Sequence, residues 1–374
     1  MDYKNIDLKW QNMLEGIRAQ VAFVRESPQA IYEDIKGKLQ LKAAPERVYL
    51  VGCGDSWYCG MATRFAFEDW AGISTEALQA LEFSRYLVHY APKNSLILAV
   101  SNSGRVSRTV EAIVQARKRG LITVGTTSNL EEGLSQEAEF TIDLAYSERR
   151  FAPGTSSYMA SLIVQYCLAL YLAVVAGRMD ETQVDQKLRE ISALAESMTK
   201  TIDANLPIME ELVKRVKLDD QVIFIGGGPN YGTAFFSMAK VIEATRTGAV
   251  GQELEEWAHE QYFFTNEGTY TFMIAPPGAS VDRAREQMYA VKAMQSTCIA
   301  VCDPDDTETA TMADIVAPVY GKFDEILSPI LYCVPAEILA FHFAVANNLV
   351  MLGFDNPKIK DVNFKQIFGS DILR

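Results

Sequence analysis

The sequence has few of the residues that build metal centres, disulfide frameworks or nucleic-acid surfaces. It holds three histidines and six cysteines among 374 residues, with no CxxC pair and no histidine near a cysteine at ligand spacing. We therefore expect no metal or other cofactor, and reduced, buried cysteines. Acidic side chains outnumber basic ones by 48 to 35, giving a formal net charge of −13. That balance argues against a nucleic-acid partner, which needs basic surface to neutralise phosphates.

Long apolar runs are also scarce. The longest, residues 161–177, falls short of the roughly 20 residues that a membrane span needs, and it predicts a buried helix. The first residues, MDYKNIDLKW, lack the basic start and apolar run of a signal peptide. We expect a soluble, cytoplasmic protein with no membrane partner. Hydrophobic residues make up 49% of the chain, which is enough to build two domains of ordinary size.

Short runs rich in Val, Ile and Leu alternate with longer helical patterns, and this alternation predicts parallel sheets covered by helices. Landmarks in the first half recur in the second half at one constant offset, which indicates an internal duplication. The pairs that share this offset are Gly54 and Gly228, Gly104 and Gly278, and Glu82 and Glu256. The expected strands are 47–51, 96–100, 121–125 and 140–144, then 221–225, 271–275, 297–301 and 314–316.

From these patterns we expect five segments. They are an N-terminal helical arm (1–45), a first α/β domain (46–178), connecting helices (179–216), a second α/β domain (217–350) and a C-terminal tail (351–374). Pro28 is expected near the start of a helix in the arm, because proline is tolerated in the first turn.

The segment GCGDS, residues 52–56, follows the first expected strand. It is not a dinucleotide fingerprint, because GxGxxG would need glycine where Trp57 stands. Backbone N–H groups at the start of the next helix would suit an anion. A tight turn capped by Asp55 or Ser56 is the alternative. Cys53 is expected to be buried and unreactive.

The segment SNSGRVSRT, residues 101–109, carries more information. Two serines around an asparagine place several neutral donors at one helix N-terminus, with Arg105 and Arg108 nearby. A phosphate monoester needs this combination, so we favour phosphate binding over a simple polar loop. A third polar turn, PGTSS at 153–157, either completes the pocket or caps the following helix.

Acid-base candidates are limited. His342 lies in an apolar helical context and is expected to be packed, and His89 has no obvious partner. His259 lies among carboxylates in ELEEWAHEQ, which suits a general acid or base near neutral pH. Lys240 and Glu243 are three residues apart on one expected helix and share a face. A surface ion pair is the alternative there.

Together these residues resemble the tandem sugar isomerase (SIS) family, in the form seen in the isomerase half of glucosamine-6-phosphate synthase and in fructosamine-6-phosphate deglycases. GCGDS is similar to the family's GCGTS, and SNSG to its SQSG. The segment 328–345, SPILYCVPAEILAFHFAV, is similar to its API-x-Y-x-VP-x-x-LLAYH-x-A. Asp355 and Pro357 fit the D-x-P before the family's C-terminal tail.

The resemblance implies roles for individual residues. Glu243 would shuttle a proton between C1 and C2, and His259, sixteen residues later (259 − 243), would assist ring opening. Substrate contacts are implied at Cys53, Gly54, Asp55, Ser56, Ser101, Asn102, Ser103, Ser107, Thr155, Lys240 and Glu256. The family also implies two SIS-type α/β domains, a homodimer and a site near the subunit interface.

The sequence departs from the family at several positions. Glu260 and Gln261 follow the histidine where the family has Gly-Pro, and Val106 stands in place of a phosphate-binding threonine. Asp55 replaces another threonine, and we interpret it as a helix cap or a contact to a sugar hydroxyl or amine. The family's Schiff-base lysine would fall at Val362, and the nearby lysines are Lys358, Lys360 and Lys365.

The hypothesis that follows is a phosphosugar isomerase for an amino-sugar or fructosamine 6-phosphate, coupled to deamination or deglycation. No glutamine-hydrolysing segment with an N-terminal cysteine is visible, so glutamine-driven synthesis is not expected. Two alternatives stay open. One is a non-catalytic sugar-phosphate sensor, and the other is an isomerase of neutral sugar phosphates.

Overall fold

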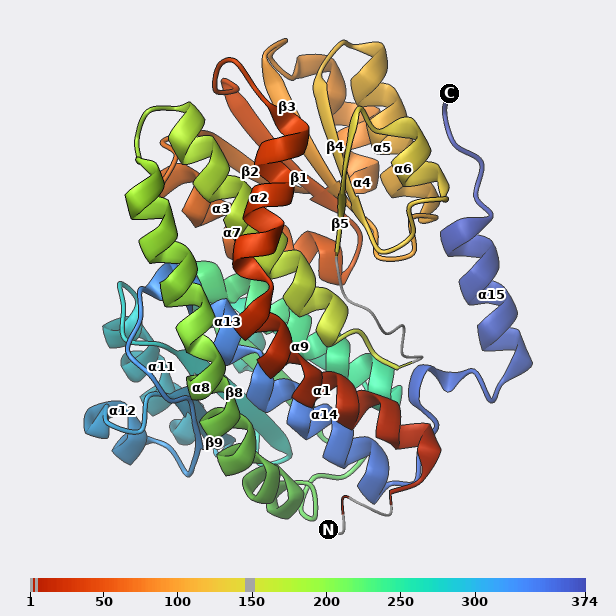
Figure 1. Ribbon diagram of the computed structural model, residues 1–374. Helices are drawn as coiled ribbons and strands as arrows, with labels where there is room; N and C mark the ends of the chain where they lie inside the picture. Colours follow the sequence, from red (N-terminus) through yellow and green to blue (C-terminus); the bar gives the residue numbers. More distant parts are fainter. Residues whose placement is uncertain (1–2, 4–5, 145–151) are drawn as a thin grey trace. The chain divides into compact units, whose positions relative to one another are not determined.

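The computed structural model describes residues 3, 6–144 and 152–374, which form two compact units (Figure 1). The C-terminal sheet unit comprises Met1–Ala22, Arg150–Thr155 and Ala193–Asp355. The N-terminal sheet unit comprises Phe23–Arg149, Ser156–Ser192 and Asn356–Arg374. Helices α1 (Leu8–Glu26) and α8 (Glu181–Leu212) contribute residues to both units.

The N-terminal sheet unit is built on five parallel strands in the order β2-β1-β3-β4-β5. They are β1 (Arg47–Gly52), β2 (Ser74–Gln79), β3 (Ser95–Val100), β4 (Ile122–Thr127) and β5 (Phe140–Asp143). Strands β1 and β3 are buried almost throughout, as expected for central strands covered on both faces. Val51 pairs with Ala99 in the register, so the loops after β1 and β3 leave the sheet at the same edge.

Helices cover both faces of this sheet. On one face α3 (Asp55–Asp69) packs against α7 (Ser156–Val175), and α2 (Pro28–Leu39) also packs on α7. Gly60 lets α3 approach Leu50 of β1 closely. On the other face Tyr49 and Ile97 join a core with the helices that follow β2, β3 and β4. Those helices are α4 (Ala80–Glu82), η1 (Phe83–Leu87), η2 (Val88–Tyr90), α5 (Ser107–Lys118) and α6 (Gly133–Glu137).

The C-terminal sheet unit repeats this plan, with strands in the order β10-β9-β8-β6-β7. They are β6 (Gln221–Gly226), β7 (Ala249–Glu253), β8 (Thr269–Ala275), β9 (Thr297–Cys302) and β10 (Ile315–Pro318). Read from β7, the order matches that of the first sheet. Strands β1 and β6 begin at Arg47 and Gln221, which keeps the offset between Gly54 and Gly228. The duplication expected from the sequence is therefore confirmed.

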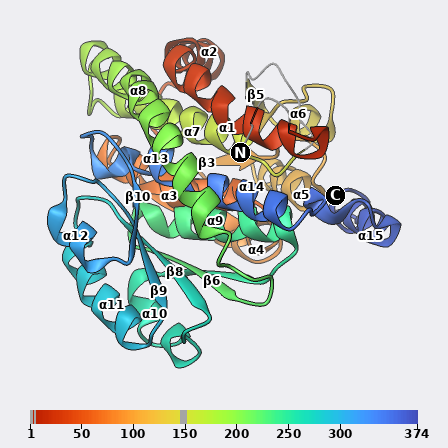
Figure 2. The same ribbon diagram turned by 90° about the horizontal axis from the view of Figure 1, so that it is seen from below.

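In this unit α9 (Pro229–Thr245) and α14 (Val334–Ala346) lie side by side in both views (Figure 1, Figure 2). The opposite face of the sheet packs on α10 (Leu254–Trp257), α11 (Val281–Ala293) and α12 (Thr307–Met312). The remaining elements are η3 (Gln261–Phe263), η4 (Glu325–Leu327), α13 (Pro329–Tyr332), η5 (Met351–Gly353) and, in the N-terminal sheet unit, α15 (Pro357–Phe368).

The eight expected strands are all present, within two residues at each end. Strands β2 and β7, one in each half, were not expected. The connecting segment forms a single helix, α8, with Pro207 inside it, and Pro28 opens α2 as expected. Two segments, Ser156–Val175 and Glu325–Ala346, are long and apolar enough to cross a membrane, but 89% of the apolar 18-residue window in each is buried inside the protein. The expectation of a buried helix at 161–177 is therefore confirmed.

Candidate functional site

The loops after β1 and β3 meet at a topological switch point in the N-terminal sheet unit. Strand β1 is flanked by β2 on one side and β3 on the other, so the chain leaves β1 and β3 toward opposite sides of a crevice. Open parallel sheets bind ligands at such crevices, outside the carboxyl ends of the strands. The structure thus brings the first predicted segment, 52–56, beside the second, 101–107.

The first loop is shaped by two glycines. Gly54 has φ +54°, and a Cβ on Gly52 would lie 2.6 Å from Ser56 Cβ. Gly54 is the N-cap of α3, and its carbonyl accepts from the N–H groups of Trp57 and Tyr58. The alternative in which Asp55 or Ser56 caps the helix is therefore wrong, because both already lie in its first turn. Asp55 instead adds negative charge at the positive end of the helix dipole.

Cys53 corrects one expectation. Cys53 is exposed, whereas the other five cysteines are buried. Its exposure arises because the chain turns away from the sheet immediately after Gly52. Its thiol still lies in a sheltered position, with Thr109 Oγ1 of α5 at 3.9 Å from Sγ. Desolvation raises the pKa of the Cys53 thiol, so the side chain is exposed without being an activated nucleophile.

The second loop buries two of its three serines. Ser101 is 1% exposed and Ser107, at the start of α5, is 5% exposed. Within the described part of the chain, Ser101 Oγ has no hydrogen-bond partner. A buried hydroxyl without a partner is costly, and a bound ligand oxygen would relieve that cost. Gly104 closes the turn with φ +72°.

The other donors of this loop are partly engaged. Asn102 Oδ1 accepts from Ser128 Oγ at 2.8 Å, and Ser103 Oγ accepts from the backbone N–H of Arg105 at 3.3 Å. Both side chains lie nearer the surface than Ser101. The hydroxyl of Ser103 can still donate its proton outward.

The two expected cations are committed elsewhere. Arg108 donates to Glu111 Oε2 at 2.5 Å and also to the backbone carbonyl of Asp371. The guanidinium of Arg105 lies 5.0 Å from the ring centroid of Phe368. In this structure the positive end of α5 and the neutral donors, rather than a free arginine, make the loop attractive to an anion.

A buried carboxylate that the sequence analysis missed ties the C-terminal residues to α5. Glu111 is fully buried and accepts from Ser84, Arg85, Arg108 and the backbone N–H of Leu373. Burial alone would raise the pKa of this carboxyl, but hydrogen bonds from Arg85, Leu373 and Ser84 hold it below its ordinary value. The only signal in the sequence was an acidic residue on the apolar side of the helix.

In the C-terminal sheet unit the structure pairs Lys240 with Glu243. Lys240 is fully buried, and its Nζ donates to Glu243 Oε2 at 2.6 Å and to the carbonyl of Gly154 at 3.2 Å. Glu243 keeps 35% of its side chain exposed. Because Lys240 is buried, the alternative of a surface ion pair is wrong. Thr155, the expected substrate contact beside Gly154, is also buried.

His259 lies on an exposed loop after α10. Its side chain is 66% exposed, and Nε2 lies 3.5 Å from Glu255 Oε1. Arg283 binds both oxygens of Glu255, and these hydrogen bonds lower the pKa of that carboxyl. Glu256 is exposed on the same short helix. A carboxylate beside the histidine was expected, and the partner is Glu255.

The fold places Glu243 and His259 at opposite edges of the second sheet. Helix α9 starts after the carboxyl end of β6 and ends just before the amino end of β7, so Glu243 in its last turn lies near the amino edge. Strand β7 then crosses about 16 Å at 3.3 Å per residue. His259 follows its carboxyl end. One chain therefore does not bring these two candidates together.

The three tail lysines lie on α15, in the N-terminal sheet unit with the two loops. Lys365 forms an ion pair with Asp361 at 2.8 Å. Residues Lys358 and Lys360 lie on the exposed surface of the same helix. Val362, at the position of the family's lysine, is 54% exposed.

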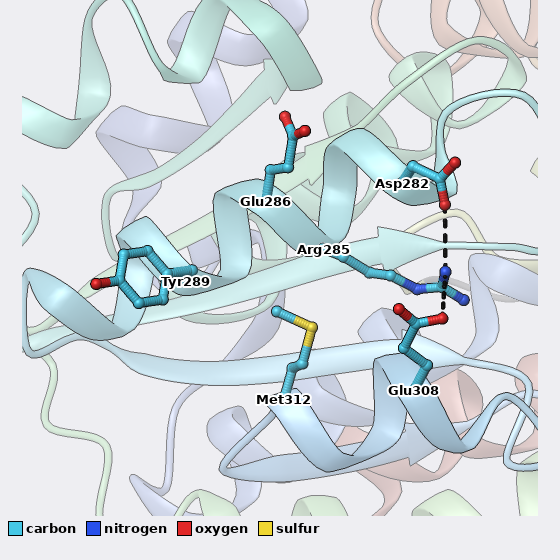
Figure 3. Close-up of a pocket in the computed structure, with 6 residues that line it drawn as sticks. All are labelled: Asp282, Arg285, Glu286, Tyr289, Glu308 and Met312. Carbon is cyan, nitrogen blue, oxygen red and sulfur yellow. Dashed lines mark hydrogen bonds and ion pairs between the residues drawn. The ribbon is translucent and has the colours of Figure 1, made fainter.

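An open depression of about 590 Å³ lies on α11 and α12 and does not suit an anion. In Figure 3 the Arg285 guanidinium lies between the carboxylates of Asp282 and Glu308, at 3.2 and 2.7 Å. Asp306 adds a third contact at 2.9 Å. The positive charge of Arg285 is therefore already neutralised by these three carboxylates. Across the described residues, no group of three or more His, Cys, Asp or Glu side chains is arranged to hold a metal.

Comparison with known proteins agrees with this architecture. Residues 41–171 match the SIS domain. The chain is 30% identical over 347 residues to a glutamine–fructose-6-phosphate aminotransferase (isomerizing) of Gloeobacter violaceus, covering 90% of this chain and 56% of that protein. A Methanosarcina mazei protein of the same name is 24% identical, with 92% and 56% covered. The chain thus spans little more than half the length of these curated relatives.

Solved structures show the same fold. The C-terminal domain of glucosamine-fructose-6-phosphate aminotransferase from Francisella tularensis superposes with a TM-score of 0.78 at 19% identity, covering 91% of this chain and 97% of that one. Glucosamine-6-phosphate deaminase from Thermotoga maritima gives a TM-score of 0.68 at 22% identity, with 91% and 96% covered. Residues 41–171 of the chain thus match the SIS domain, and the second half repeats its five-stranded parallel sheet.

Proposed function

We propose that the protein is a phosphosugar isomerase that acts on an amino-sugar or fructosamine 6-phosphate, with isomerisation coupled to deamination or deglycation. The observation that carries this proposal is the buried Lys240, which fixes a partly exposed carboxylate on Glu243 at 2.6 Å. A carboxylate of this kind can take a proton from carbon and return it, provided that substrate reaches it. The names of the relatives and structural neighbours support the substrate class.

In the proposed mechanism the loops at 52–56 and 101–107 hold the phosphate through backbone N–H groups and the serine hydroxyls. Glu243 removes a proton from C1 or C2 of the open-chain sugar, and electrons move into an enediol or enamine. The same carboxyl returns the proton to the neighbouring carbon. His259 moves the proton between the ring oxygen and the anomeric hydroxyl during ring opening, and Lys240 holds the Glu243 carboxylate in place.

The opposite placement of Glu243 and His259 supports a homodimeric enzyme. If both act on one sugar, the histidine must come from a neighbouring chain, which would put the site near the subunit interface. The exposed aromatic residues Phe263 and Phe264, which follow His259 closely, suit burial in such an interface.

A cytoplasmic location and the domain boundaries given above also remain predictions.

The proposal is tested by incubating the full chain with a panel of hexosamine 6-phosphates, fructosamino-acid 6-phosphates and neutral hexose 6-phosphates. Release of ammonia or of an amino acid, together with a ketose or aldose phosphate, is the expected result. Turnover of neutral sugars alone would replace the proposal with a simple isomerase. Binding across the panel without turnover would favour a sensor.

A further inference from the structure

The second half keeps the frame of the anion-binding loops. Gly228 (φ 54°, ψ −126°) has nearly the backbone conformation of Gly54 (φ 54°, ψ −128°), and each is the N-cap of the helix that follows. Gly278, the counterpart of Gly104 in the duplication, lies in the loop between β8 and α11. The crevice between β6 and β8 is therefore the counterpart of the switch point between β1 and β3.

A carboxylate of the chain itself lies in the loop after β8. Glu325 Oε2 accepts from the backbone N–H of Ala279 at 2.9 Å. A Cβ built on Gly278 would lie only 2.2 to 2.5 Å from the three carboxylate atoms of Glu325. Glycine at this position thus leaves room for the carboxylate, and an anion already occupies the N-terminal side of α11.

Hydrogen bonds of the neighbouring residues 324–328 hold the backbone of Glu325 in place. Asp324 Oδ1 accepts from the N–H of Ile326 at 3.1 Å and starts η4. The hydroxyl of Ser328 donates to the carbonyl of Glu325 at 2.6 Å and accepts from Asn230 Nδ2 at 2.8 Å. Asn230 and Ser328 are both fully buried. This chain of hydrogen bonds links the loop after β6 to the segment that carries the carboxylate.

The composition of the loop agrees with this arrangement. Pro276 and Pro277 stand where the first half has Asn102 and Ser103, so two N–H donors and two polar side chains are missing. The backbone N–H of Ala279 is used by Glu325. A phosphate entering this crevice would meet a fixed negative charge, and like charges at such distances oppose binding strongly.

We propose that Glu325 is a built-in anion that closes the crevice of the second half to phosphate, so that each chain binds a single sugar phosphate, in its first half. The second part rests on the proposed function, and the first part does not. Glu325 thereby adds to the two prolines of this loop in making the duplicated halves unequal in ligand binding.

The experiment counts inorganic phosphate bound to the full chain by isothermal titration calorimetry. Wild type is expected to bind one phosphate per chain, and Glu325→Ala two. Glu325→Gln removes the charge but keeps the side-chain length and an oxygen for the Ala279 N–H. It is expected to bind one phosphate, because the side chain still fills the crevice. Glu308→Ala removes an exposed carboxylate in the same half and should bind one, as wild type does.

A background variant separates this inference from the proposed function. Ser103→Asp places a negative charge in the first loop. The single variant Ser103→Asp should then bind no phosphate, and the double variant Ser103→Asp/Glu325→Ala should bind one phosphate per chain. If wild type binds none and Glu325→Ala binds one, the first-half site fails and Glu325 keeps its role.

Equal stoichiometry in wild type and Glu325→Ala would overturn the inference. Folding of each variant is checked by circular dichroism. Glu325→Ser offers a second way to empty the crevice if the alanine variant is poorly folded. For either emptied variant, phosphate should raise the melting temperature more than it does for Glu325→Gln, and equal increases would also overturn the inference.

Discussion

Lys240 and Glu243 form an ion pair in which one partner is sealed from solvent and the other is not. Lys240 is fully buried, whereas Glu243 keeps 35% of its side chain exposed, and 2.6 Å separates Nζ from Oε2. A buried ammonium needs a partner, because desolvation opposes its charge. The pair therefore fixes a carboxylate that stays partly exposed, as the proposed proton transfer needs.

The first prediction is that Glu243→Gln abolishes turnover and spares binding. Removing a positioned base typically costs about 10²–10⁴-fold in rate, and the amide should still accept from Lys240. The measurement is kcat on the best substrate of the panel, with sugar-phosphate affinity measured by calorimetry. Glu286→Gln, an exposed carboxylate paired with Arg283, is the control and should retain full activity. Unchanged turnover in Glu243→Gln would remove this residue from the mechanism.

The second prediction concerns Asp55, in the first turn of α3 and within the segment 52–56 that we propose holds the phosphate. A carboxylate there opposes a phosphate and attracts a cationic amine, so Asp55→Asn should reduce the preference for amino-sugar phosphates over neutral ones. We expect a change of about tenfold in the ratio of kcat/KM values, equivalent to about 1.4 kcal/mol. The two substrate classes are compared on the same enzyme preparation. If both values fall equally, Asp55 acts on the helix and not on the amine.

How far the sequence predicts this fold depends on burial. Central strands such as β1 and β8 are apolar on both faces and were found from composition. The strands β2 and β7 were missed because each is an edge strand of its sheet and carries polar residues such as Glu76 and Gln252. The repeat could have revealed them, since the two segments are separated by nearly the same offset as the other landmarks.

Contacts in the candidate site were predicted where the partners are close in sequence and missed where they are distant. The loop serines and the Lys240–Glu243 spacing lie within a few residues of each other, so a helical period or a strand end places them together. The Glu111–Leu373 hydrogen bond joins residues 262 positions apart, and the contact between Glu325 and Ala279 spans 46. Neither has a local pattern, because the sheet topology alone brings these segments together.

The third prediction is that Glu111 anchors the end of the chain. Gln115 Nε2 donates to the carbonyl of Leu373 at 2.5 Å, and Ile372 packs on the core that contains α5. Glu111→Gln should lower the free energy of unfolding by about 2 kcal/mol, since hydrogen bonds to charged groups contribute about 1.5–3 kcal/mol each. Deletion of residues 371–374 should cost a similar amount.

A double-mutant cycle in urea checks this anchor. If Glu111 acts through the chain end, deleting residues 371–374 should cost less in the Glu111→Gln background than in wild type, by about 1 kcal/mol, because contacting residues couple by 0.5–3 kcal/mol. Glu137→Gln, which removes only the exposed ion pair with Arg374, should change stability little. Additive losses would mean that the two features stabilise the unit independently.

The last prediction is a pH dependence of stability that comes from His342. This histidine is fully buried, and Tyr3 Oη lies 3.3 Å from its Nε2. Desolvation lowers the pKa of His342 from 6.5 to about 4. The unfolded chain therefore binds this proton first as the pH falls, so stability is complete above about pH 6.5 and declines toward pH 4. The full difference corresponds to about 3 kcal/mol.

The check is urea unfolding of wild type and His342→Gln between pH 7 and pH 4.5. Carboxylates also titrate in this range, so the informative quantity is the difference in slope between the two proteins. Wild type should lose about 2 kcal/mol more than His342→Gln over this interval, because glutamine cannot take up a proton. His89→Gln replaces an exposed histidine and should follow the wild-type slope. Parallel slopes for wild type and His342→Gln would show that the buried imidazole does not oppose protonation.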